Sequence, residues 1–181
     1  MRGLLEQTPW VRRAAVRRQW PDHLLVQIEE QVPIARWQDH RLVNRYGELF
    51  QGDSDAVLPE LAGPPGAERQ VAARYTTFSA LLAPLGSELA QLVLSPRYAW
   101  QLKLASGITL ELGRDRPREP VDARLERFVT AYPQVVAALG HPIEHVDLRY
   151  PHGFAVRAQA PAAGSGGEAR ATDASRRTLK E

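Results

Sequence analysis

The feature of this sequence that most constrains its fold is a period-two alternation of apolar and polar residues. In segments 100–104 and 108–112, tryptophan, leucine and isoleucine occupy the even positions and polar residues the odd ones. Successive side chains of a β-strand point to opposite faces of the sheet, so each segment predicts a strand that buries one face. The three residues between them, Ala105–Gly107, are typical of a hairpin turn. We therefore expect antiparallel sheet in this part of the chain.

Other segments predict the remaining strands and two main helices. Further strands are expected at 11–18, 24–34, 89–94 and 145–157. Helices are predicted where apolar residues recur three and four positions apart, at Val71, Tyr75, Phe78 and Leu82 (ending near Pro84) and at Val121, Leu125, Phe128 and Tyr132 (ended or kinked by Pro133). The 181 residues are enough for one domain or two small ones. An α+β fold with an antiparallel-rich sheet is expected.

Residues 1–37 make an incomplete domain by themselves. They predict the end of a helix followed by a two-stranded hairpin, whose apolar face needs a complete helix packed on it. We therefore expect that Met1 is a late start, and that the upstream DNA continues in frame and encodes an apolar run of about 20 residues. Residues 38–157 contain the remaining strands and both main helices. Residues 158–181 are small, polar and aperiodic, and predict a disordered C-terminal tail.

No motif in the sequence points to catalysis or to a cofactor. There is no cysteine for a thiolate nucleophile or a Cys-based zinc site, and no Walker loop, GxSxG elbow or GxGxxG loop. His141 and His145 have the spacing of helical zinc ligands, but Pro142 lies between them and no glutamate follows His141. The sequence therefore predicts a non-enzymatic protein with no metal and no cofactor.

A cluster of arginines near the N-terminus has two interpretations. Four arginines, at positions 12, 13, 17 and 18, lie between Trp10 and Trp20 with no acidic residue among them. Such a cluster can bind nucleic acid, or it can be a solvated strand face whose arginines meet acidic residues of a neighbouring strand. Glu29 and Glu30 in the next apolar segment favour the solvated face.

The last strand, HVDLRYPHGFAVR (145–157), is the most suggestive element for binding. A final strand that leads into a tail often lies at a sheet edge, where another chain can extend the sheet by strand addition. Pro151 cannot donate a hydrogen bond to a strand ladder, which favours an edge or a bulge. Tyr150 and Phe154 could be anchors for a partner or core residues. Both occupy even positions, as the apolar Val146 does, so in one strand all three side chains point to the same face, which favours the core.

Four segments, in order and with similar spacing, resemble the bacterial FtsQ/DivIB cell-division family. They are PWVRRAAVRRQWPDHLLVQIEEQVPIARW (9–37), YAWQLKLASGITLELGR (98–114), RLERFVTAYP (124–133) and HVDLRYPHGFAVR (145–157). The resemblance covers about residues 4–157. It implies the second half of a POTRA domain in residues 1–37 and the β-domain of the family in residues 38–157. The cytoplasmic tail, the transmembrane helix and the first POTRA strand and helix of such proteins have no counterpart in this sequence.

The resemblance also implies a function, a location and a set of contact residues. Proteins of this family are single-pass inner-membrane proteins that face the periplasm and have no catalytic activity. They link early and late division proteins during septum formation, chiefly by binding the FtsB–FtsL pair. The last strand of the β-domain and the helix before it receive a segment of FtsB. The residues that match partner-facing positions are Arg97, Phe128, Ala131, Arg149, Tyr150, Gly153 and Phe154. This reverses the interpretation of Tyr150 as a core residue and leaves Phe154 open, while Pro151-His152 departs from the family pattern.

Two binding functions and an enzyme remain as alternatives. One is a POTRA module of an outer-membrane assembly or secretion system, which would carry further POTRA units or a β-barrel. Another is nucleic-acid binding by the arginine cluster, which would depend steeply on salt concentration. An enzyme would need a pocket with perturbed titratable groups.

Overall fold

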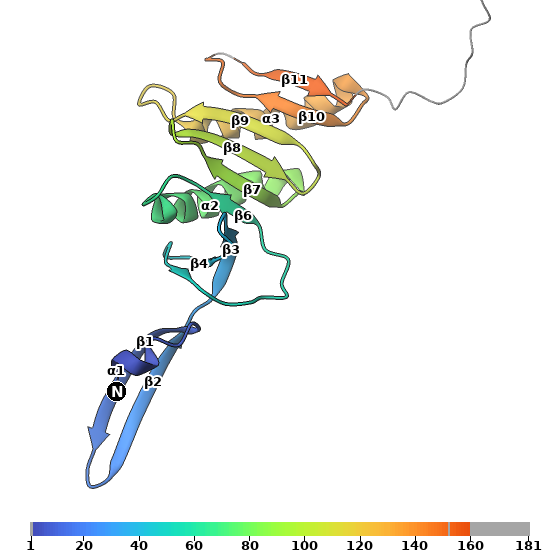
Figure 1. Cartoon of the computed structure of the whole chain (residues 1–181). Helices are drawn as coiled ribbons and strands as arrows, with labels where there is room; N and C mark the ends of the chain where they lie inside the picture. Colours follow the sequence, from blue (N-terminus) through green and yellow to red (C-terminus); the bar gives the residue numbers. More distant parts are fainter. Residues whose placement is uncertain (1, 152, 160–181) are drawn as a thin grey trace, which may run out of the picture.

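The computed structural model describes residues 2–151 and 153–159 of the chain. Its strands form two sheets, of which the smaller is a hairpin of β1 (Val11–Gln19) and β2 (His23–Glu30). A one-turn helix, α1 (Arg2–Leu5), precedes the hairpin. The hairpin lies at one end of the molecule and the last strands lie at the other (Figure 1). The fold is α+β, as the sequence predicts.

The larger sheet has nine strands in mixed orientation. They are β3 (Pro33–Trp37), β4 (Leu42–Asn44), β5 (Leu49–Phe50), β6 (Glu60–Ala62), β7 (Leu89–Leu94), β8 (Ala99–Leu104), β9 (Thr109–Arg114), β10 (Ile143–Asp147) and β11 (Ala155–Ala158). Their order across the sheet is β11-β10-β9-β8-β7-β6-β3-β4-β5. The pairs β3–β6, β6–β7 and β9–β10 are parallel, and the other neighbours are antiparallel. The two edges of the sheet are therefore β5 and β11.

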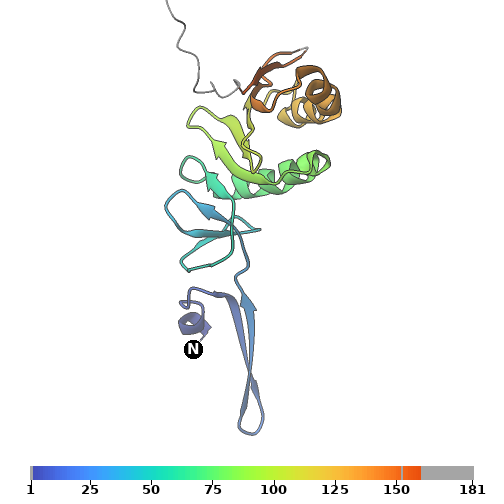
Figure 2. The same cartoon turned by 90° about the vertical axis from the view of Figure 1, so that its right-hand side faces the viewer.

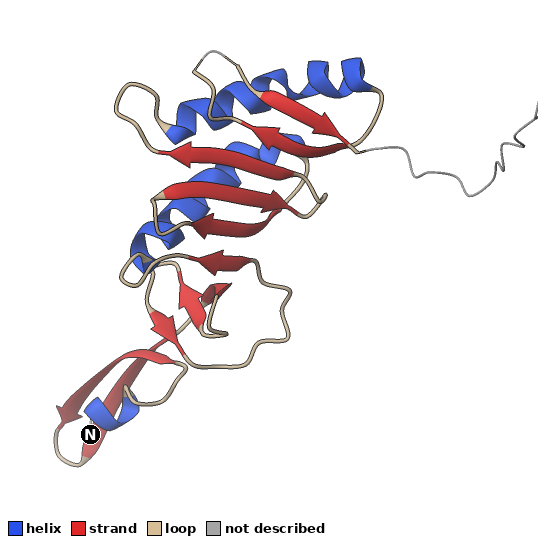
Figure 3. Cartoon of the chain, turned by 45° about the horizontal axis from the view of Figure 1, so that its top comes forward, coloured by secondary structure: helices blue, strands red, loops and turns tan. Residues whose placement is uncertain are grey.

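Two helices cover one face of this sheet. The first, α2 (Glu68–Leu82), connects β6 to β7, and the second, α3 (Val121–Leu139), connects β9 to β10. Figures 2 and 3 show both helices on the same side of the strands. Facing them, one apolar residue from each of seven paired strands forms a continuous row: Trp37, Leu61, Leu92, Leu102, Leu110, Val146 and Val156. Burial of each such leucine contributes about 1.5–3 kcal/mol relative to exposure, so the alternation in the sequence is what holds the sheet to the helices.

The predicted strand 24–34 is divided between the two sheets. Its first part is β2, whose ladder with β1 ends where the Gln31 N–H donates to the Trp10 carbonyl, and the chain enters the large sheet at Pro33. The prediction that this strand is half-buried is wrong for the hairpin. Leu24, Val26 and Ile28 lie on one face of β2 and are 42–55% exposed. Among the described residues, α1 lies against β1, where Ala14 is buried, and the rest of this face is open.

The predicted last strand 145–157 is also divided, into β10 and β11. The two strands pair antiparallel, with Val146 opposite Val156 and Asp147 opposite Ala155. The chain reverses between Leu148 and Phe154, yet the apolar residues before and after the turn all occupy even positions. The alternation therefore continues through the turn, and the sequence reads as one strand. The predicted disordered tail lies almost wholly outside the described residues.

The second main helix runs through Pro133 instead of ending there. Pro133 is exposed, so water can hydrate the Val129 carbonyl that has no N–H donor at position 133. The helix ends at Gly140, which has a positive φ of 64° and donates its N–H to the Val136 carbonyl. Within the described part of the chain, neither this helix nor any other has the length and apolarity needed to cross a membrane.

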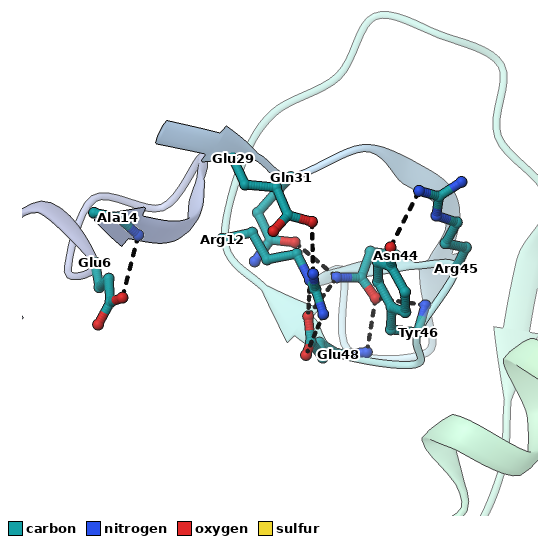
Figure 4. Close-up of polar contacts among 9 residues, drawn as sticks. All are labelled: Glu6, Arg12, Ala14, Glu29, Gln31, Asn44, Arg45, Tyr46 and Glu48. Atoms are coloured by element: carbon teal, nitrogen blue, oxygen red, sulfur yellow. Dashed lines mark hydrogen bonds and ion pairs between the residues drawn. The ribbon is translucent and has the colours of Figure 1, made fainter. Parts of the chain in front are cut away.

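A polar network joins the hairpin to the β5 edge of the large sheet (Figure 4). The Arg12 guanidinium donates hydrogen bonds to Glu29 (2.6 Å) and Glu48 (2.7 and 3.2 Å) and lies 3.7 Å from the centre of the Tyr46 ring. The buried Asn44 donates to the side-chain oxygens of Gln31 and Glu48 at 2.8 and 2.7 Å. Arg12 thus meets acidic residues of both sheets, in line with the solvated-face interpretation of the arginine cluster.

An aromatic contact supports the same junction. The ring of Trp10 meets that of Phe50 edge-on, with 5.5 Å between their centres. A Cβ atom added at Gly52 would lie 3.0 Å from the Trp10 ring, so a side chain at position 52 would crowd it. The hairpin is therefore packed against the β-domain at its base and exposed along its length.

Candidate partner-binding surface

The edge strand β11 offers unpaired backbone groups to another chain. It pairs with β10 on one side, and no described strand pairs with its other side. The prediction that the last strand lies at a sheet edge is therefore confirmed. Only four residues long, β11 begins after the 148–154 turn and ends where the Gln159 N–H donates to the Pro142 carbonyl at 2.8 Å. A partner strand can extend the sheet at this edge.

Aromatic side chains pack beneath the edge. Phe154 is half-buried, and its ring meets that of Phe128 edge-on, with 5.6 Å between their centres. Phe128 is completely buried and also contacts Tyr132. Phe128 therefore has no surface of its own for a partner and acts by supporting Phe154. Ala131, one turn further along α3, is half-buried.

The 148–154 turn holds the most exposed of the predicted contact residues. Tyr150 is 54% exposed. It is therefore not a core residue, although its even position in the alternation favoured that interpretation. Gly153 follows in the same turn, and nothing lies within 4 Å of the position its Cβ would take. Tyr150 and the start of β11 therefore lie close together, next to the unpaired edge.

Arg149 is held by acidic residues of its own chain. Its guanidinium donates to both carboxylate oxygens of Asp147, at 2.8 and 2.6 Å, and lies 3.2 Å from Glu111. This pairing holds the pKa of Asp147 below its usual range and raises the pKa of Arg149. The Arg149 stem covers Gly113, where an added Cβ would lie 2.9 Å from the Arg149 Cγ. The positive charge of Arg149 is therefore balanced before any partner binds.

A cavity of about 320 Å³ at this end of the sheet is lined by arginines. The lining residues are Ser95, Arg97, Ala99, Gly113, Arg114, Arg116, Arg124 and Arg149. Of the predicted contact residues, Arg97 and Arg149 are brought together here. Arg114, Arg116 and Arg124 were not predicted, although the sequence ELGRDRPRE (111–119) is rich in arginine. We call this space the arginine cavity.

Tyr98 is a further exposed residue that the sequence did not single out. It lies between Arg97 and Ala99 in the β7–β8 turn, with a positive φ of 58° and an exposed side chain. The turn is closed by hydrogen bonds from the Tyr98 N–H to the Ser95 carbonyl and from the Ala99 N–H to the Ser95 hydroxyl. A left-handed backbone is uncommon for tyrosine, and such residues occur often at functional sites.

A larger pocket of about 600 Å³ lies away from these residues. It is lined mainly by apolar residues of α2, of β7 and of the 57–59 loop, and Glu88 is its one charged lining residue. The carboxyl groups with shifted pKa values, those of Asp39, Glu48 and Asp147, belong to ion pairs elsewhere. Within the described residues, His, Asp and Glu side chains form no group of three that could hold a metal ion.

Comparison with known proteins agrees with this architecture. Residues 35–149 match the family model described as cell division protein FtsQ/DivIB, C-terminal, and residues 1–31 match the POTRA domain, FtsQ-type. The FtsQ cell division proteins of Burkholderia pseudomallei and Nitrosospira multiformis are 47% and 46% identical to this chain, over 87% and 86% of its length. The protein of the same name from Escherichia coli is 39% identical over 83% of the chain.

The chain spans 64% of the length of the Burkholderia and Nitrosospira proteins and 56% of that of the Escherichia protein. The first family model alone covers well over half of this chain and includes the whole sheet from β4 to β10. The chain belongs to the FtsQ/DivIB family of cell division proteins.

Proposed function

We propose that this chain is a non-catalytic divisome scaffold that binds the FtsB–FtsL pair through its β-domain, with FtsB added as a strand at β11. The observation that carries the proposal is the unpaired β11 edge beside the exposed Tyr150. Membership of a family of cell division proteins supports the role in septum formation. The FtsQ-type POTRA match favours this role over that of a POTRA module in outer-membrane assembly or secretion.

Each part of the surface has a distinct physical task in this proposal. Backbone groups of β11 hydrogen-bond with the added strand, which gives affinity with little dependence on sequence. Tyr150 supplies a large and fairly rigid anchor, and Phe154 and Phe128 hold the base of the edge. Arg97 is exposed and meets an acidic side chain of FtsB, whereas Arg149 orders the turn through Asp147.

The proposal also includes a location and a role for the hairpin. We infer that the complete protein is a single-pass inner-membrane protein and that residues 1–181 face the periplasm. The hairpin belongs to its POTRA domain and is available to other divisome proteins. The periplasmic location argues against nucleic acid as a partner of the arginine cluster.

A titration with FtsB tests the proposal. The chain is titrated by calorimetry with the periplasmic C-terminal segment of FtsB from the same organism, as the parent and as Tyr150→Ala. Truncation of an aromatic anchor typically costs about 2 kcal/mol or more, so we expect affinity to fall by about thirtyfold. Tyr46→Ala is the matched control, because Tyr46 is an exposed tyrosine in the turn before β5, at the opposite edge of the sheet.

The outcomes test separately whether FtsB is the partner and whether Tyr150 contacts it. Circular dichroism first establishes that both variants are folded. Equal affinities of Tyr150→Ala and the parent would keep FtsB as the partner but remove Tyr150 from the contact. The absence of any binding by the folded parent would refute the proposed function.

A further inference from the structure

The pocket of about 600 Å³ lies between α2 and the starts of two strands, and we call it the α2 pocket. Because β3, β6 and β7 run parallel, their first residues lie at the same end of the sheet. Ile34 of β3 and Leu89 of β7 line the pocket together with the 57–59 loop, which precedes β6. Its volume is within the range of about 300–1,000 Å³ that is typical of ligand pockets.

Small residues on the helix leave room for this pocket. Tyr75, Ser79 and Ala83, from α2 and the turn that follows it, line the pocket and recur every four residues. Residues four apart lie one above the other on the same side of a helix. Two of these three have short side chains, which leave space between the helix and the strand ends. The spacing of the sequence thus places a groove along one side of α2.

The Ser79 hydroxyl has no partner in the fold. Its oxygen is buried and makes no hydrogen bond within the described residues. The neighbouring Thr76 and Thr77 hydroxyls each donate to the carbonyl four residues back, at 3.3 Å. A buried polar group without a partner costs free energy, and such groups are few in folded proteins. Ser79 therefore places an unsatisfied polar group in the wall of the pocket.

The rim of the pocket combines apolar surface with one negative charge. Val57 is fully exposed, and Leu58 and Pro59 beside it are half-buried, so the apolar lining continues outside the pocket. Glu88 is exposed and forms no ion pair in the described part of the chain. Among the described residues that line the pocket, no lysine or arginine neutralises this carboxylate.

We propose that the α2 pocket is a docking site for a protein segment in which a large apolar side chain lies next to a lysine or arginine. The apolar side chain enters the pocket as an anchor, and the cation pairs with Glu88. The backbone of the segment supplies the hydrogen bond that Ser79 lacks. Apolar surface at Val57 extends the contact beyond the pocket itself, which favours a protein segment over a small molecule.

This site is separate from the edge at which the proposed strand addition takes place. In the strand order, β8, β9 and β10 lie between β7 and the edge strand β11. A partner in the α2 pocket therefore leaves β11 free. The inference does not depend on the proposed function, and its failure would leave the FtsB titration unaffected.

Two peptides that differ only in the sign of their charge test the proposal. The ¹⁵N-labelled chain is titrated with acetyl-Leu-Lys-Leu-amide and with acetyl-Leu-Glu-Leu-amide at low salt, while NMR follows the backbone amide signals. The lysine peptide should shift the signals of Ser79, Glu88 and Leu89 and should bind more tightly than the glutamate peptide. Loss of one exposed ion pair in Glu88→Gln should weaken binding of the lysine peptide by about twofold to fivefold. Glu126→Gln, at an exposed position of α3, controls for net charge and should bind as the parent does.

Filling the pocket gives a second test that does not rely on charge. Ser79→Met places a longer apolar side chain in the pocket and should weaken binding of the lysine peptide by about tenfold or more. Thr77→Met is the matched control, because Thr77 is an exposed residue of α2 that does not line the pocket. Circular dichroism establishes that the variants are folded.

Three results would overturn the proposal. Unmoved signals, or shifts confined to residues outside the pocket, would remove the site. Equal affinities of Ser79→Met and Thr77→Met would do the same. Equal binding of the two peptides by the parent would refute the choice of a basic partner.

Discussion

Arg12 and Glu48 connect two sheets through one ion pair that two other residues reinforce. The hydrogen bond from Arg12 holds the pKa of the Glu48 carboxyl below its usual range, with a further contribution from the hydrogen bond of the Asn44 amide. Glu29 completes the set by accepting a hydrogen bond from Arg12. A carboxyl with a lowered pKa stabilises the fold above its pKa in the unfolded chain, and this contribution is lost as pH falls through the folded value. The junction should therefore be intact at neutral pH and weaken only in acid, below about pH 4.3.

NMR titration of the Glu48 side-chain carboxyl tests this account. In Arg12→Gln, the Glu48 pKa should rise toward its ordinary range because the strongest hydrogen bond to the carboxylate is gone. It should not reach that range fully, because Asn44 still donates to the same carboxyl. Arg13→Gln is the control, since Arg13 acts on Glu48 through charge alone and more weakly. Equal shifts in the two variants would contradict the assigned cause.

At the scale of elements, α3 contains a stability defect in its interior. Proline is about 3 kcal/mol less favourable than alanine inside a helix, and Pro133 lies thirteen residues into α3 on its exposed side. Replacing Pro133 with alanine should therefore raise the free energy of unfolding by about 1–3 kcal/mol. Gln134→Ala, at the neighbouring exposed position, should change it by only a few tenths. Urea unfolding of both variants measures the difference, and a Pro133→Ala variant no more stable than Gln134→Ala would show that the helix has already adapted to the proline.

The sequence predicted elements where one physical pattern dominates. The β8–β9 hairpin and the first half of α3 were predictable because their apolar residues face one core. β6 was not predicted, because a strand of three residues within a segment rich in proline and glycine is too short to show an alternation of apolar and polar residues. The turn between β10 and β11 was not predicted, because the apolar residues on both sides of it occupy even positions and the alternation continues without a break. Short strands depend on their neighbours across the sheet, which a single sequence does not display.

The candidate site was predictable only in part, for a related reason. The resemblance to the FtsQ/DivIB family predicts that Tyr150 and Arg97 face a partner, and both side chains are exposed in the structure. Phe128 was assigned to the same surface but is completely buried beneath Phe154. Arg124 could not be predicted, because its partners are backbone carbonyls, which have no signature in the sequence. A buried arginine in an amphipathic helix is visible only after the fold is known.

At the scale of the whole molecule, the hairpin extends from the β-domain as an arm fixed at its base. Arg12 and Trp10 supply the contacts at that base, and the length of the arm is exposed. Because the chain contains no cysteine, spin labels can be introduced at Asp22→Cys in the hairpin turn and Lys103→Cys on β8. Pulsed electron resonance should give a narrow distance distribution in the otherwise unchanged chain.

Arg12→Ala should broaden that distribution, because it removes the hydrogen bonds to both Glu29 and Glu48. Arg17→Ala is the control, since Arg17 lies on the same strand and its side chain makes no hydrogen bond or ion pair within the described residues. If the distribution of Arg12→Ala is as narrow as that of Arg17→Ala, the Trp10–Phe50 contact and the Asn44–Gln31 hydrogen bond fix the arm without Arg12.

The shortness of β11 has a consequence for the kinetics of the proposed assembly. A four-residue edge gives an added strand only a few backbone hydrogen bonds, so the lifetime of the complex depends mainly on how long the Tyr150 anchor stays in place. In the proposed complex, the exposed Arg97 would act earlier, because opposite charges raise the rate of encounter and do so most at low ionic strength. Association and dissociation are thus controlled by different residues. In the proposed complex, such a contact would form quickly and separate completely.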